Sequence, residues 1–382
     1  MFYTATQIRH PVLFTLLMLF ACAAVAQQAD IPVPVEPRPA WLLPLEVEQA
    51  AEVPHATVAN GIYHLLVDNQ VRVGGDAEAE YFFHYAEQVL NQTGVESNSQ
   101  ITVNFDPVYE TLVLHDVSVW RDGRQTDRLQ TARISLINRE EELDSLLYSG
   151  SKSLHLILDD IRVGDIIEYS FSIRGDNPIY NGIFAYSRSL NWGIPVHHLL
   201  LAVHWLKPGP LHHQIRNSEL ALDSSGIAGG TLYRIEHRNT EPLTEDENTP
   251  HWFNPYGVVY FSESANWRQV ADWARPLMES GVESNAAIRK LAARIRNEHR
   301  EPAARIAAAL QYVQDEIRYF GIEIGENSHR PAKASVTLAR RYGDCKDKTV
   351  LLLSILRELG VEAYAALVNS RKQQQIKDII PA

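Results

Sequence analysis

The chain has 382 residues and a formal net charge of −12, with 45% hydrophobic and 21% charged residues. This composition is that of an ordinary globular protein, and the length suits two or three domains. The acidic balance argues against a nucleic-acid partner, because binding to phosphates requires a concentrated basic surface.

The amino terminus has the anatomy of a signal peptide over residues 1–26. Arg9 and His10 precede an apolar run from Val12 to Phe20, and the small residues Ala24-Val25-Ala26 form the cleavage site. The run is too short to span a bilayer as an ordinary helix. We therefore expect a periplasmic or secreted protein with no integral membrane span after cleavage.

Two alternatives remain for this segment, an uncleaved anchor and a lipoprotein signal at Cys22, which the bulky Phe20 disfavours. Removal of residues 1–26 leaves Cys345 as the one cysteine, so no intrachain disulfide can form. A single thiol in an exported protein indicates a reactive group or an intermolecular partner.

Residues 27–55 are rich in proline and predict an extended linker. Residues 56–250 then show short alternating runs separated by turn residues, which is typical of a β-sandwich. A tight turn is expected at Asp122-Gly123. The predicted strands cover 62–67, 70–73, 79–85, 101–105, 111–120, 164–173, 196–205 and 231–237.

A helical period begins at Trp267, within a second domain that we place at residues 265–382. Pro302 suits the first turn of a helix. The apolar residues that follow it at steps of four, three and four predict one buried stripe. These residues are Ile306, Leu310, Val313 and Ile317.

A second helix is predicted from about Asp344 to Leu359, with Gly360 as its C-terminal cap. Its almost continuous apolar surface after the first turn predicts a helix buried on most sides, the central helix of the domain. Residues 361–368 read as a strand that follows it.

Cys345 lies in the first turn of this helix. The helix dipole and the nearby cations are expected to stabilise its thiolate, and first-turn amides are expected to face a developing oxyanion. The cations are Arg340, Arg341, Lys346 and Lys348. The alternative is that Cys345 is a small buried hydrophobe that caps a core helix.

Residues 342–348, Tyr-Gly-Asp-Cys-Lys-Asp-Lys, and 359–364 resemble the cysteine motif of the bacterial transglutaminase-like superfamily. Residues 317–319 and 328–331 resemble the segments that precede this motif, and 158–169 with 194–196 resemble the DUF3857 domain. The resemblance implies a β-sandwich-like DUF3857 region, followed by an α+β papain-like domain that is incomplete in this chain.

The resemblance also implies a Cys-His-Asp site in which Cys345 attacks an amide carbonyl. No histidine follows His329 in the chain, and His329 precedes the cysteine, opposite to the order of the motif. We expect a loop role for His329. The site would then be inactive, either because the chain is truncated or because the domain is a remnant kept for binding.

The predicted parent activity is thiol-dependent acyl transfer or amide hydrolysis through Cys345, on a protein or peptide substrate in the cell envelope, with no cofactor. The alternative is a non-catalytic periplasmic binding or scaffold protein that uses its DUF3857 β-domain. The sequence does not choose among cross-linking, proteolysis and deamidation, because a fold does not fix a function.

Three further groups predict structure rather than chemistry. The pairs His197-His198 and His212-His213 alternate across strands, so no metal site is expected. Glu140–Glu142 and Asp144 predict a solvated helix face rather than a pair of catalytic carboxylates. An aromatic group near the domain boundary favours inter-domain packing over ligand recognition. It consists of Trp252, Phe253 and Tyr256.

Overall fold

The computed structural model describes residues 31–50, 52–54, 58, 60–75, 78–139, 146–245, 248–250 and 252–381. The predicted signal peptide at 1–26, the lipoprotein alternative at Cys22 and the acidic run Glu140–Glu142 with Asp144 lie outside these residues. None of the helices in the described ranges is both long and apolar enough to cross a bilayer.

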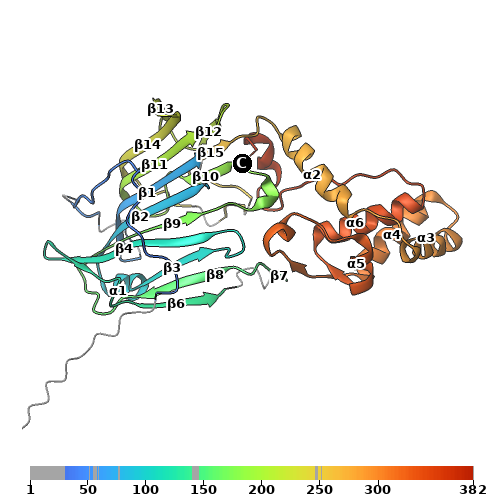
Figure 1. Cartoon of the computed structure of the whole chain (residues 1–382), viewed down its shortest axis with the longest axis horizontal. Helices are drawn as coiled ribbons and strands as arrows, with labels where there is room; N and C mark the ends of the chain where they lie inside the picture. Colours follow the sequence, from blue (N-terminus) through green and yellow to red (C-terminus); the bar gives the residue numbers. More distant parts are fainter. Residues whose placement is uncertain are drawn as a thin grey trace, which may run out of the picture.

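The first half of the chain is built on an eight-stranded sheet (Figure 1). Each predicted strand lies within it or in the sheets packed on it, and the two runs at 62–73 form one continuous strand, β1. Neighbouring strands are antiparallel except β1 and β11. In sheet order they are β13 (Asp223–Ile227), β14 (Gly230–Thr240), β11 (Val196–Leu206), β1 (Ile62–Gly74), β2 (Glu80–Val89), β9 (Ile166–Arg174), β4 (Thr111–Arg121) and β5 (Arg124–Asp127).

The predicted turn at Asp122-Gly123 joins β4 to β5. Asp122 has φ 51° and Gly123 has φ 75°. Positive φ at both central residues matches the right-handed twist of a tight hairpin, and Asp-Gly is a sequence that tolerates it. The local sequence therefore fixes this edge of the sheet.

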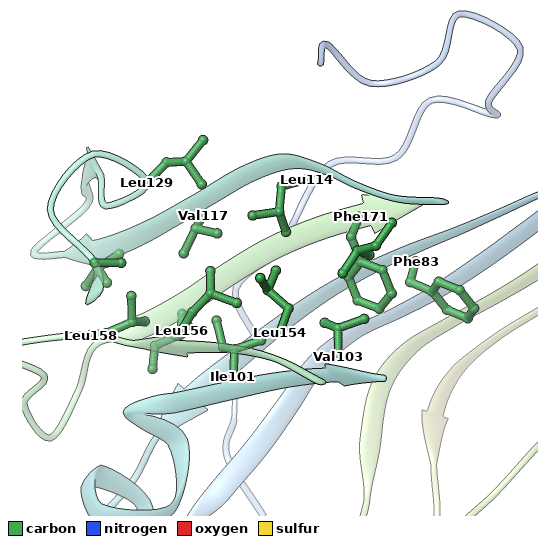
Figure 2. Close-up of a cluster of buried hydrophobic side chains, with 14 of the residues drawn as sticks. Phe83, Ile101, Val103, Leu114, Val117, Leu129, Leu154, Leu156, Leu158 and Phe171 are labelled. Carbon is green, nitrogen blue, oxygen red and sulfur yellow. The ribbon is translucent and has the colours of Figure 1, made fainter. Parts of the chain in front are cut away.

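Two smaller sheets complete a sandwich-like β region, as predicted. Figure 2 shows apolar side chains of β3 and β8 meeting side chains of β4 and β9 between two layers. Leu154 and Leu156 of β8 are fully buried in this core. The sheets are β3 (Gln100–Phe105), β8 (Lys152–Ile157) and β6 (Arg133–Asn138), and β10 (Ala185–Ser189), β15 (Val258–Ser262) and β12 (His212–Arg216); a short helix, α1 (Gln92–Asn98), precedes β3.

The proline-rich segment packs against the large sheet. The amide of Glu36 donates to the carbonyl of Leu114 at 3.0 Å, and the amide of Leu114 donates to the carbonyl of Pro34 at 3.0 Å. Arg38 reaches over the sheet to pair with Asp116 at 2.7 Å and Glu168 at 3.1 Å. Residues 31–50, predicted to be a linker, are therefore part of the fold, because Arg38 compensates carboxylates that the sheet buries.

The second half is helical around α6 (Cys345–Glu358), the predicted central helix, with Gly360 after it at φ 74°. Figure 1 shows α6 among the other helices of this half. Its apolar residues form one core with residues of these helices. These helices are α2 (Trp267–Gly281), α3 (Ala286–Glu298), α4 (Pro302–Glu316) and α5 (Ala334–Arg340).

The predicted stripe of α4 is only half correct. Val313 and Ile317 are buried, but Ile306 and Leu310 are 40% and 42% exposed. The fully buried residue of the first half of α4 is Ala309. A small side chain permits close approach, so we attribute the rotated contact face to this alanine.

The predicted strand at 361–368 does not form. No strand pairs with it among the described residues, and Tyr364 is 80% and Val368 89% exposed. A strand needs a partner for its backbone groups, so alternating apolar residues alone do not produce one.

Short pairings join the two halves. β7 (Leu147–Tyr148) runs parallel to β17 (Gly321–Ile322), and the indole of Trp273 on α2 donates to the carbonyl of Ile179 at 2.9 Å. Ile179 lies in the 3-10 turn η3 (Pro178–Tyr180), which contacts a second turn, η4 (Gly325–Ser328). The β region thus holds the segment that leads to the central helix.

The final segment returns to the β region. The carbonyl of Asp378, at the end of the 3-10 turn η5 (Gln373–Asp378), accepts from Gln214 at 3.1 Å and Arg216 at 2.9 Å. Trp252, Phe253 and Tyr256 line the hollow where this segment docks, together with Arg371 and Gln375. Their position agrees with the predicted packing role.

The buried carboxyl of Asp68 should make the stability of the β region depend on pH. Burial raises the pKa of this carboxyl to about 7, against a hydrogen bond from Gln70 and the charge of Arg38. A raised folded pKa means that stability is lost as pH rises toward that value. We therefore expect the free energy of unfolding of Asp68→Asn, relative to that of the parent chain, to rise by about 2 kcal/mol from about pH 5 to about pH 8.

The measurement is urea unfolding of both chains at each pH. Asp159→Asn is the matched control, because Asp159 is 67% exposed. A stability difference for Asp68→Asn that does not change with pH would contradict the burial of a titrating carboxyl at this position.

Candidate active site around Cys345

The start of α6 is organised by the buried carboxylate of Asp344. Its Oδ1 accepts from the amides of Lys346 at 3.0 Å and Asp347 at 3.1 Å, the geometry of a helix N-cap. Its Oδ2 binds the ammonium of Lys346. The next residue, Cys345, is thereby held at the mouth of the helix with its side chain exposed.

Two glycines permit this packing. A Cβ on Gly343 would lie 2.6 Å from the Cβ of Asp347, and one on Gly321 would lie 2.5 Å from Leu147 and 3.2 Å from the Cβ of Asp344. Both distances are shorter than ordinary contacts between carbon atoms. The chain therefore needs glycine at these points to bring β7, β17 and the helix start together.

Tyr319 reaches the cysteine from a neighbouring strand. β16 (Arg318–Tyr319) pairs in parallel with β18 (Tyr342–Gly343), which leads directly into α6. Burial, and then the charges of the nearby Cys345 and Asp344, raise the pKa of the Tyr319 hydroxyl. Tyr319 belongs to the 317–319 segment that resembles the lead-in to the motif, but the sequence gave it no role at the site.

The thiol itself is not activated in this arrangement. Partial loss of solvent at the sulfur, and then the charge of Asp344, raise the pKa of Cys345, against the opposing effects of the Lys346 ammonium and amide. The Lys346 amide and ammonium at the helix start lower the pKa as expected, but burial and the charge of Asp344 outweigh them.

The physical reason is that each nearby cation already has a partner. Lys346 binds Asp344 and, at 3.3 Å, Glu323. Arg340 binds Asp347. Lys348 donates to the carbonyl of Ile317 at 2.6 Å, and Arg341 donates to the hydroxyl of Tyr312 at 2.6 Å and to Glu316 at 3.3 Å. Positive residues near a cysteine in sequence need not face its sulfur.

The expected oxyanion donors are also largely committed. The amides of Lys346 and Asp347 donate to Asp344, and the amide of Lys348 donates to the carbonyl of Asp344 at 3.0 Å. Within the described residues, the amide of Cys345 has no such acceptor. It is the first-turn donor best placed to meet a developing negative charge.

His329 follows the turn η4, as expected for a loop histidine. Its ring stacks edge-on against Tyr180 and Trp273, and its Nδ1 lies 2.9 Å from the hydroxyl of Ser328. Burial, and then the charge of Lys346, lower its pKa. Among the described residues, no hydrogen bond joins a histidine ring to Cys345.

The paired histidines are also apart from the site. His198 is buried and bonds Glu236 at 2.7 Å, whereas His197 bonds Asn239 at 2.9 Å. His212 and His213 belong to β12. In the described part of the chain, no three side chains of the metal-binding types gather closely enough to hold an ion.

Comparison with protein families identifies both halves. Residues 75–244 match DUF3857, a domain of unknown function with a solved structure, and residues 289–378 match the transglutaminase-like superfamily. The chain therefore carries a DUF3857 domain followed by a transglutaminase-like domain. No curated protein matches the chain.

Among solved structures, the chain resembles a candidate protease from Parabacteroides distasonis ATCC 8503, with a TM-score of 0.65 and 14% identity. The match covers 79% of this chain and 60% of that protein, so the chain spans less than two thirds of its length. At this identity the match shows a shared fold. A candidate nutrient-binding protein from Legionella pneumophila aligns at a TM-score of 0.24 and 11% identity, over 68% of this chain and 87% of that one.

Replacing Asp344 tests the organisation of the helix start. Asp344→Ala removes the N-cap and one partner of the half-buried Lys346, so we expect the free energy of unfolding to fall by about 2 kcal/mol. Denaturant unfolding measures this loss. Thr349→Ala, which removes a hydroxyl bonded to the Cys345 carbonyl at 2.7 Å, is the control and should cost far less.

Equal losses for the two variants would mean that Asp344 contributes no more than any polar residue of this turn.

Proposed function

We propose that Cys345 is the nucleophile of thiol-dependent acyl transfer or amide hydrolysis. The observation that carries the proposal is the exposed thiol at the N-terminus of the central helix, inside the region that matches the transglutaminase-like superfamily. A nucleophile needs both solvent access and a rigid support, and α6 supplies the second through its buried apolar residues.

In this reaction the Cys345 sulfur forms a bond to a carbonyl carbon, and the carbonyl oxygen becomes an oxyanion that the Cys345 amide meets. The amine leaves with a proton, and a thioester remains. Water or a second amine then attacks the thioester, which returns the thiol. Attack on an amide requires deprotonation of a thiol whose pKa is raised here, so a base is needed.

We propose that the chain forms a thioester with an activated ester but does not turn over amides, because no described histidine ring hydrogen-bonds Cys345 to act as the base. We further propose that the protein works in the bacterial cell envelope, as a periplasmic or secreted protein, on a protein or peptide. The apolar segment at the amino terminus, followed by the small residues of a signal-peptidase cleavage site, supports this location.

A second candidate is a non-catalytic binding or scaffold protein that acts through its DUF3857 domain. The raised pKa of Cys345 and the complete pairing of the cations around it favour this alternative. The two candidates differ in one property, which is whether the native thiol accepts an acyl group.

The test uses p-nitrophenyl acetate, an activated ester whose leaving group departs without help from an acid. On a Cys22→Ala chain, where Cys345 is the one thiol, we expect a burst of about one equivalent of nitrophenolate and one acetyl group on the peptide that contains Cys345. Cys345→Ser in the same background is the control and should give no burst.

Acetylation that occurs only after unfolding would reject the nucleophile and favour the binding protein. Continuous hydrolysis of a peptide amide by the native chain would instead reject the proposed lack of turnover.

A further inference from the structure

A second hollow lies in the β region, against α2. It has a volume of about 590 Å³ and is lined by side chains from β2, β9, β10, η3 and α2. Eight of its nineteen lining residues are aromatic, and Cys345 is not among them. The aromatic walls include Tyr81, Tyr109, Phe184, Trp267 and Trp273. Walls of this kind suit a flat apolar group.

Arg188 of β10 brings a cation to this pocket. Its guanidinium carbon lies 4.5 Å from the ring centre of Tyr186 and 5.3 Å from that of Phe83. Its one hydrogen bond to the backbone is to the carbonyl of Ser187 at 3.3 Å. No carboxylate pairs with it anywhere in the described ranges, although a half-buried arginine ordinarily has such a partner.

The hydroxyl of Tyr186 is a second unsatisfied group at the same wall. The side chain is 7% exposed, and its oxygen has no well-formed hydrogen bond among the described residues. The adjacent guanidinium can only donate to that oxygen, so the hydroxyl proton has no acceptor. A buried donor without a partner is costly, and a ligand oxygen would satisfy it.

Carboxylates stand on the other side of Tyr81. The Tyr81 hydroxyl donates to Asp176 at 2.7 Å, and Glu110, which accepts from the Asp106 amide at 2.6 Å, also lines the pocket. The rings of Tyr81 and Tyr186 are 5.8 Å apart. The pocket therefore has a positive end and a negative end, with aromatic surface between them.

We propose that this pocket binds an apolar monocarboxylate, with its carboxylate at Arg188 and the Tyr186 hydroxyl and its ring-sized body between the aromatic walls. Arg188 can offer two parallel donors to such a group. Glu110 and Asp176 repel a second negative charge at the opposite end, which limits the ligand to one carboxylate. This site lies outside the region of Cys345 and does not depend on the proposed thiol chemistry.

The experiment titrates the full chain with 3-phenylpropionate and follows the emission of tryptophan, since Trp267 and Trp273 line the pocket. The neutral isostere 3-phenylpropanamide is titrated in parallel. We expect saturable binding of the acid and binding of the amide that is weaker by about ten-fold or more. Equal affinities, or no binding of the acid, would overturn the proposal.

Variants locate the site. Arg188→Gln should weaken binding of the acid by about ten-fold and leave binding of the amide nearly unchanged. Arg133→Gln, at an arginine 71% exposed, should change neither affinity. Tyr186→Phe should weaken binding of the acid by a few-fold. An Arg188→Gln chain that binds the acid as the parent does would overturn the proposal. If that variant does not fold, the comparison of acid and amide on the parent chain decides.

A peptide that ends in phenylalanine separates the two sources of such a ligand. Tighter binding of the peptide than of 3-phenylpropionate, lost when its C-terminus is amidated, assigns the pocket to a peptide C-terminus. Binding of the small acid alone assigns it to a free carboxylate. Binding of the amidated peptide as tightly as the free one would contradict recognition by Arg188.

Discussion

The buried carboxylate of Asp344 is the interaction on which the candidate active site depends. It caps α6 through the amides of Lys346 and Asp347 and holds the Lys346 ammonium, so one side chain fixes both the direction of the helix and the position of its nearest cation. Cys345 is exposed because its neighbours on both sides are drawn inward. Together with the partial burial of the thiol, which has the larger effect, the same carboxylate raises the pKa of Cys345. Asp344 therefore holds Cys345 in an exposed position but also disfavours the ionised thiolate that would react.

Both domains contribute contacts that hold the start of α6 in place. The strand pair of β7 with β17 places the DUF3857 domain against Gly321, whose missing Cβ leaves room for Asp344 and Leu147. The chain beyond α6 returns to the β region, where the carbonyl of Pro381 accepts from Ser262. Both links join segments that lie far apart in sequence. The β domain is therefore part of the support of the cysteine helix, and its own aromatic pocket offers a separate place for a ligand.

Much of the fold was predictable because the sequence carries local signals for it. Alternation of apolar and polar residues predicted the strands, and Asp122-Gly123 predicted a hairpin. Pro302 and Gly360 indicated a helix start and a helix end. The motif around Cys345 indicated the transglutaminase-like region, which the family match confirms. What failed depended on tertiary partners: Ile306 and Leu310 lie off the contact face, and residues 361–368 have no described strand beside them. Periodicity shows neither which face docks nor which cation faces a sulfur. The position of Tyr319 beside Cys345 and the Arg188 pocket gave no local signal, because only the fold assembles them.

The central claim is that Asp344 positions Cys345 and suppresses its ionisation. The most direct measurement is the rate of Cys345 alkylation by iodoacetamide against pH, on Cys22→Ala chains with and without Asp344→Asn. The account predicts rapid reaction of the native chain with a midpoint above the ordinary thiol value of about 8.5, and a lower midpoint in Asp344→Asn. A midpoint well below that value in the parent chain, or one that Asp344→Asn does not move, would contradict it.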